Sequence, residues 1–104
     1  MTLSEFKATL DSDRPPDSTT GPQAALWHLA KGDWAYAHKL AQDHDDRDGA
    51  WVHAHLHRVE GDQANAGFWY REAGRPVSTL ALADEWDEIA MALLDQHPDG
   101  RRGD

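Results

Sequence analysis

Histidine is the residue type in this chain best suited to chemistry, because imidazole ligates metal ions and exchanges protons near neutral pH. His53, His55 and His57 fall within five residues, and His28 and His38 precede them. In a helix, the first and last of these three histidines lie four residues apart on one face, which is the spacing with which two imidazoles hold one metal ion. His28 is the third candidate ligand, because it matches His57 in a repeat described below.

The metal interpretation competes with a structural one. A metalloprotease helix needs His-Glu-x-x-His and a di-iron bundle needs Glu-x-x-His, and the sequence contains neither pattern. We therefore interpret the histidines as interface residues that hydrogen-bond neighbouring helices, and we predict no metal and no cofactor. A small metal- or histidine-dependent enzyme built on His28, His53 and His57 is the alternative.

The helix that carries these histidines also positions them. Val52, Leu56 and Val59 form its predicted core stripe. This stripe places His55 at the edge of the core and the other two histidines on the opposite flank.

Composition narrows the class of protein. The chain has 104 residues, a net charge of -9 and no Cys, which indicates one domain without disulfides, Cys-ligated metals or a cysteine nucleophile. The acidic surface argues against nucleic acid and anionic membranes as partners. No apolar run approaches the ~20 residues that span a bilayer, and Met1–Lys7 lacks a secretory pattern, so we expect a cytoplasmic protein.

Glycine, proline and capping residues divide the chain into helices, and no segment alternates with a period of two. The fold class is therefore all-α, with five or six helices. They are predicted at residues 4–11 with Ser4 as N-cap, 23–31, 34–43, 50–60 and 63–73, and in a final amphipathic stretch from Leu82 to Leu93. We expect a short N-terminal helix and Pro-rich loop (1–22), a helical-hairpin domain (23–96) and a flexible tail (97–104).

The middle of the chain repeats itself. Gly32-Asp33 returns 29 residues later as Gly61-Asp62. Gly suits the left-handed end of one helix, and Asp accepts hydrogen bonds from the free amides that begin the next. Each unit is therefore predicted to be a helical hairpin, and the two hairpins must stack because one alone cannot bury its apolar side.

The repeat resembles known helical repeats. The Gly-Asp turn, Ala66, Tyr70, Ala73 and Pro76 resemble the consensus of tetratricopeptide and Sel1-like repeats. The segment 49–76, with Trp-Val-His-Ala-His-Leu-His-Arg-Val-Glu-Gly-Asp and Trp-Tyr-Arg-Glu-Ala-Gly-Arg-Pro, is similar to the core of a family of uncharacterised bacterial and fungal proteins. The resemblance implies stacked hairpins and no particular activity.

Aromatic side chains are the predicted contacts of a partner. The five Trp are expected in the core, whereas Phe68 points away from the apolar stripe of its helix. Either the final helix or the N-terminal segment covers it, which we favour, or it anchors a partner. We predict an interaction module that binds a protein, a peptide or a second copy in the groove between hairpins, through Phe68, Trp69, Tyr70, His53 and His57.

The final predicted helix has two faces. Its apolar residues recur with helical spacing and are expected to pack on the hairpins. Its acidic residues are expected to form a mostly solvent-exposed face; they are Asp84, Glu85, Asp87 and Glu88.

Overall fold

The computed structural model describes residues 1–95, and within this range the regular secondary structure is entirely helical, as predicted. The six α-helices of this range are α1 (Leu3–Ala8), α2 (Gly21–Ala30), α3 (Trp34–Asp43), α4 (Arg47–Glu60), α5 (Gln63–Ala73) and α6 (Leu82–Asp95), and a short 3-10 helix, η1 (Thr9–Asp11), follows α1. The predicted tail 97–104 lies outside the described residues. Over residues 1–95, no helix combines the length and the apolar character needed to cross a bilayer.

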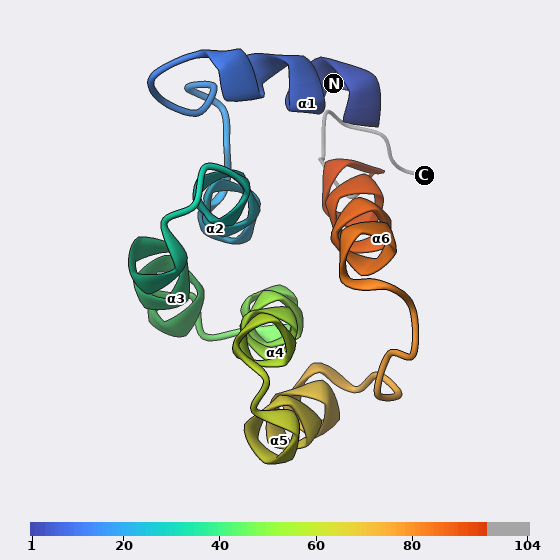
Figure 1. Ribbon diagram of the computed structural model, residues 1–104. Helices are drawn as coiled ribbons and strands as arrows, with labels where there is room; N and C mark the ends of the chain where they lie inside the picture. The colour runs from blue at the N-terminus through green and yellow to red at the C-terminus, as the bar shows by residue number, and fades with distance from the viewer. Residues whose placement is uncertain (96–104) are drawn as a thin grey trace.

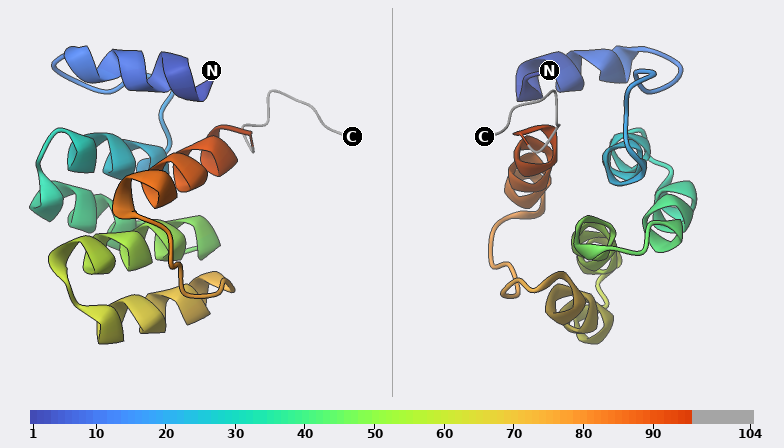
Figure 2. Two further views of the ribbon diagram at one scale, coloured as in Figure 1. Left: turned by 45° about the vertical axis from the view of Figure 1, so that its right-hand side comes forward. Right: turned by 180° about the vertical axis from the view of Figure 1, so that it is seen from behind.

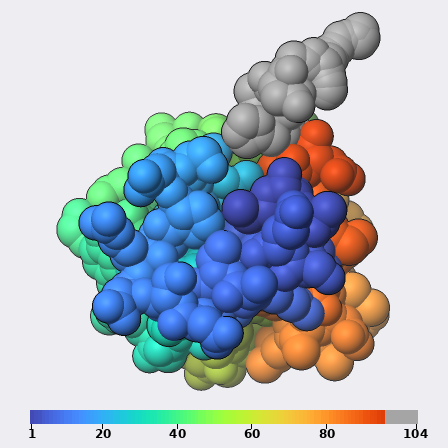
Figure 3. Space-filling model, turned by 90° about the horizontal axis from the view of Figure 1, so that it is seen from above, coloured from blue at the N-terminus to red at the C-terminus, as the bar shows by residue number. Residues whose placement is uncertain are grey.

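The helices form two stacked hairpins, with α6 at the side of the stack and α1 at one end. α2 packs on α3, α4 packs on α5, and α3 joins the two pairs by packing against α4, so that the four helices descend in a zigzag (Figure 1). α6 returns along the other side of the stack to contact α4 and α2 (Figure 2). The N-terminal segment lies across one end of the molecule, beside α6 (Figure 3).

Both predicted Gly-Asp corners are confirmed. Gly32 and Gly61 adopt φ values of +91° and +88°, in the left-handed region that side chains disfavour. Asp33 and Asp62 each accept a hydrogen bond at 3.1 Å from the backbone amide three residues later. These local interactions place the ends of α2 to α5, and α3 and α5 begin and end at the predicted residues.

Two helices of the hairpins begin earlier than predicted. α2 starts at Gly21 because Thr20 and Gln23 form a reciprocal capping box, with Pro22 in the first turn where its missing amide costs nothing. α4 starts at Arg47, inside a run of polar residues predicted to be a loop, because the Asp46 carboxylate accepts the Gly49 amide at 2.8 Å.

The N-terminal segment differs from the prediction in its cap. Thr2, and not Ser4, caps α1: its hydroxyl accepts the Glu5 amide, and the Glu5 carboxylate accepts the Thr2 amide. Phe6 is buried and stacks on Trp86 of α6, with ring centroids 6.0 Å apart. This contact attaches the N-terminal segment to α6.

The prediction that the five tryptophans lie in the core is confirmed for three of them, whereas Trp34 and Trp69 are half-buried and pack against the core. Trp27, Trp51 and Trp86 are buried. The indole nitrogen of Trp27 donates to the Thr9 hydroxyl at 3.1 Å, and that of Trp86 donates to the Leu26 carbonyl at 3.0 Å. The rings of Trp27 and Trp86 therefore bury apolar area while their N–H groups keep a hydrogen bond.

Candidate functional site

The candidate site residues gather around α4, which is the central helix of the described fold. It contacts α2, α3, α5 and α6, so the whole stretch from Gly49 to His57 is buried. Over these nine residues α4 is surrounded by neighbouring helices, and only its two ends reach solvent. The prediction that His55 sits at the edge of the core is therefore wrong: its side chain is only 1% exposed and faces α6.

The histidine cluster, made of His38, His53 and His57, lies between α3 and α4. The Nε2 atoms of His38 and His53 are 3.0 Å apart. The His57 ring lies 4.9 Å from the His53 ring and 5.3 Å from the His38 ring, between centroids. One ring nitrogen from each histidine lies within 4.8 Å of the other two. The prediction that these are interface histidines bonded to a neighbouring helix is confirmed for His38 and His53, whereas His57 bonds Glu60 of its own helix.

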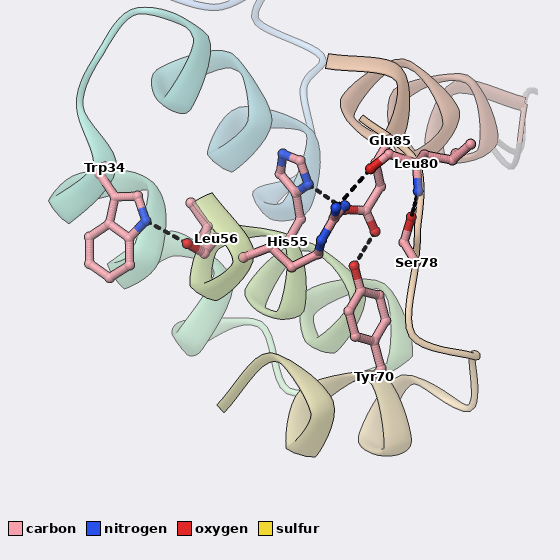
Figure 4. Close-up of polar contacts among 8 residues, drawn as sticks. Trp34, His55, Leu56, Tyr70, Ser78, Leu80 and Glu85 are labelled. Carbon is pink, nitrogen blue, oxygen red and sulfur yellow. Dashed lines mark hydrogen bonds and ion pairs between the residues drawn. The ribbon is translucent and has the colours of Figure 1, made fainter. Parts of the chain in front are cut away.

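Two tryptophans hold the cluster in place. Trp34 stacks on His38, with centroids 4.8 Å apart and planes 11° apart, and Trp69 stacks on His53, at 3.9 Å and 15°. The Trp34 indole donates to the Leu56 carbonyl on α4 at 2.8 Å (Figure 4). Because the Trp34 indole is hydrogen-bonded to α4 and also stacks on His38, it fixes the position of His38 relative to that helix.

Burial disfavours the charged forms of His53 and His38. It lowers the pKa of His53 to about 4, and His38 and His57 act in the same direction. Burial also lowers the pKa of His38, reinforced by His57 and opposed by Glu60. The His57 Nδ1 lies 2.5 Å from Glu60 Oε1. Neutral imidazoles with free lone pairs are the form that binds transition-metal ions.

The structure replaces one predicted metal ligand. His28 packs edge-on against Trp27 and Tyr36 and is not part of the cluster, and His38 takes its place beside His53. The repeat matched positions within each hairpin, but α3 rather than α2 is the first hairpin's main contact with α4. The rule that consecutive helices pack together would have favoured His38.

On the other side of α4, a carboxylate is fully buried. Glu85 of α6 is 0% exposed and accepts hydrogen bonds from His55 Nδ1 and Arg58 Nη1, both at 2.7 Å, and from the Tyr70 hydroxyl (Figure 4). Arg58 also donates to the Leu80 carbonyl at 2.7 Å, which holds the loop before α6. We call Glu85, His55, Arg58 and Tyr70 the Glu85 network.

The expectation that Glu85 belongs to a solvated face is therefore wrong. Glu85 follows Leu82 by three residues and precedes Ile89 by four, so it lies on the apolar stripe of α6. This spacing is the sequence feature that could have predicted its burial. Tyr70, expected to contact a partner, is also buried, and its hydroxyl is occupied by Glu85.

The network fixes the proton on His55. Burial alone raises the pKa of Glu85, but hydrogen bonds from His55, Tyr70 and Arg58 outweigh it and hold the pKa below its ordinary value. An ionised carboxylate only accepts, so His55 Nδ1 must carry the proton that it donates. In the neutral ring, Nε2 is then an acceptor at the opposite edge.

His55 is also one of the residues that line an open apolar groove of about 470 Å³. The groove runs between α1 and η1, α2, α4 and α6, and Lys7 and Asp87 form an ion pair of 2.9 Å among its lining residues. Its other main lining residues are Leu10, Leu29, Val59, Leu82 and Trp86. Val59, predicted in the core, is 37% exposed, because the last turn of α4 faces this groove.

Phe68 is not covered by another helix. It is 44% exposed and lies edge-on to Trp69, with centroids 5.0 Å apart. The prediction that α6 or the N-terminal segment covers it is wrong, because α6 packs mainly on α4 and α2.

Comparisons with known proteins found nothing similar. The sequence matches no protein-family model, and neither a curated protein nor a solved structure resembles the chain detectably.

Proposed function

We propose that this chain is a small interaction module that binds a segment of a partner protein in the apolar groove, with an indole side chain seated over His55. The observation that carries this proposal is the His55 Nε2 atom. Within residues 1–95, Nδ1 is the ring nitrogen of His55 with a hydrogen bond, whereas Nε2 has none, and the buried His55 is one of the residues that line the groove. A buried acceptor gains stability from a ligand that supplies a donor.

The groove favours a particular ligand chemistry. Its walls are aliphatic and aromatic, so the occupant must offer a large apolar surface, and Nε2 requires one N–H or O–H donor. An indole ring combines ~150–250 Å² of burial with one N–H donor. The net charge of -9 favours basic residues around that anchor and opposes nucleic acid.

The hairpin architecture supports the same proposal. Stacked helical hairpins present grooves between helices, and such grooves can bind partners. The resemblance to tetratricopeptide and Sel1-like repeats, proposed from the sequence, supports a binding role by analogy. Relative to the sequence prediction, the proposed contact surface moves from Phe68 and Trp69 to the groove lined by Leu29, Val59 and Leu82. We place this activity in the cytoplasm.

The test is an NMR titration of the full chain with indole and with N-methylindole, which has nearly the same shape but no N–H donor. We expect saturable shifts at Leu29, Val59 and Leu82 with indole. N-methylindole should bind about 5–10-fold more weakly, because it lacks a hydrogen bond worth ~1–1.5 kcal/mol. A lysine-rich amphipathic peptide with a single Trp should bind more tightly than indole and lose affinity when that Trp is replaced by Phe.

Matched variants locate the binding surface. Val59→Lys and Leu82→Lys place charge in the groove from exposed positions, and either should abolish binding. Met91→Lys, an exposed change elsewhere on α6, and Phe68→Ala on α5 should leave it intact. Equal affinity for indole and N-methylindole contradicts the role of His55, and binding lost in Phe68→Ala but kept in Val59→Lys contradicts the groove. A dimer that dissociates in Val59→Lys would identify a second copy as the occupant in place of a partner protein.

A further inference from the structure

The histidine cluster lies on the opposite side of α4 from the groove. His53 and His57 project from α4 toward His38 on α3, and the proposed peptide contact uses none of them. Three imidazoles directed at one another from two helices are more than helix packing requires, since apolar side chains fill such a space without polar atoms.

The spacing of the nitrogens fits a metal ion. Zn²⁺ bound to imidazole at ~2.0–2.1 Å with tetrahedral angles places two ligand nitrogens about 3.3 Å apart. The Nε2 atoms of His38 and His53 are already 3.0 Å apart, and a nitrogen of His57 lies within 4.8 Å of both. Closing the site therefore needs a movement of at most about 1.5 Å by the His57 ring, which side-chain rotation provides.

The surroundings of His57 resemble those of a metal-bound histidine. Its Nδ1 lies 2.5 Å from Glu60 Oε1, so Nε2 is the nitrogen left to face an ion. A carboxylate on the second nitrogen of a ligating histidine fixes its tautomer and orientation and raises its basicity. Asp62, also near His57, is engaged as the N-cap of α5.

The site is held firmly and remains open to solvent. Trp34 and Trp69 stack on His38 and His53 and restrict the rotation of both rings. His38 is only half-buried, which leaves a path for an ion from solvent.

We propose that the histidine cluster binds one transition-metal ion of the Zn²⁺ class, with His38, His53 and His57 as ligands and Glu60 as a positioning residue for His57. Neutral imidazoles suit Zn²⁺, Co²⁺, Ni²⁺ and Cu²⁺ and do not suit Mg²⁺ or Ca²⁺, which prefer oxygen. Three protein ligands leave one position of a tetrahedral ion for water or another ligand. The ion would join the two hairpins directly, because its ligands come from α3 and α4.

The experiment is calorimetric titration of the untagged, metal-free full chain with ZnCl₂, and with MgCl₂ as the control salt. We expect one Zn²⁺ per chain with a dissociation constant in the micromolar range or below, and no heat from Mg²⁺. His38→Ala, at a half-buried position, should weaken binding by at least ~10-fold, and Glu60→Gln by about 10–100-fold. His28→Ala and His44→Ala, which remove imidazoles outside the cluster, should bind Zn²⁺ like the parent chain.

A second readout does not depend on the variants. Co²⁺ should give the intense visible absorption of a tetrahedral site and quench the fluorescence of Trp34 and Trp69, and saturating Zn²⁺ should reverse both effects. At Zn²⁺ about 100-fold above its dissociation constant, the melting temperature of the parent chain should rise by at least ~10 °C.

Three results would overturn the site. They are the absence of saturable Zn²⁺ binding up to roughly 1 mM, undiminished binding in His38→Ala, and binding lost in His28→Ala. If His38→Ala does not fold, weak octahedral Co²⁺ absorption in the parent chain overturns the site by itself. Val59→Lys should bind Zn²⁺ normally, so that failure of the groove and failure of the metal site are distinguished.

Discussion

Replacing Glu85 by Gln tests whether the Glu85 network organises the core. The substitution keeps the shape of the side chain but removes its charge and one acceptor oxygen. The carboxylate is 0% exposed and accepts from His55, Arg58 and Tyr70, so no water can compensate for the loss. The amide would turn an N–H₂ group toward these donors and leave the Arg58 cation without a negatively charged partner.

The expected cost follows from the burial of the pair. Removing one member of a buried ion pair costs ~3–5 kcal/mol. The Arg58 side chain is 13% exposed and keeps its hydrogen bond to Leu80, so we take the lower end, about 3 kcal/mol. A chain of this length has ~5–15 kcal/mol of stability, and the melting temperature should fall by roughly 10–20 °C.

Urea unfolding followed by far-UV circular dichroism measures this loss. Glu88→Gln on the same helix is the matched control, because Glu88 is exposed; it should change stability by less than about 0.5 kcal/mol. A double-mutant cycle with Arg58→Met should give a coupling energy of at least ~1 kcal/mol. If Glu85→Gln unfolds within about 1 kcal/mol of the parent chain, the network does not organise the core.

Two further predictions concern glycine and pH. Gly49→Ala places a Cβ 1.9 Å from the His44 carbonyl oxygen, so urea unfolding should show that the free energy of unfolding falls by at least ~2 kcal/mol. Gly67→Ala is the control: the nearest neighbour of its new Cβ is an Arg71 nitrogen at 4.0 Å, and the free energy of unfolding should rise by about 0.5–1 kcal/mol. Equal effects of the two substitutions would contradict the close contact at Gly49. The Glu85 carboxyl has a folded pKa below its ordinary 4.5, so its contribution is present above that pH and is lost as the pH falls through the folded pKa. The stability difference between the parent chain and Glu85→Gln should therefore shrink below about pH 4.5, and a difference that grows on acidification would contradict the lowered pKa.

The structural features that could be predicted from the sequence are determined by residues that lie close together in the sequence. A glycine with positive φ and an aspartate bonded three residues ahead define each corner, so Gly32-Asp33 and Gly61-Asp62 were sufficient to place α3 and α5. The cap at Asp46 is equally local, but it was hidden within a run of polar residues that also suits a loop. Helical spacing likewise placed Trp86 on the buried face of α6.

The candidate site depends on contacts that local patterns do not specify. Glu85 meets His55 across 30 residues of sequence, and that contact requires α6 to return along the side of α4. Hydrophobic periodicity gives the buried face of each helix but not the helix that covers it. The same gap explains why the sequence favours His28 over His38 as a ligand and predicts a covered Phe68.

The protonation of His55 tests the central claim most directly, because both the network and the groove depend on it. Long-range ¹⁵N–¹H correlation spectra of the imidazoles in the full chain report which ring nitrogen carries the proton. We predict a protonated Nδ1 and a bare Nε2 in the free protein, with the Nε2 resonance shifting on addition of indole while those of His53 and His57 stay in place. A proton on Nε2 with Nδ1 bare, or an Nε2 resonance that ignores saturating indole, would contradict the proposed site.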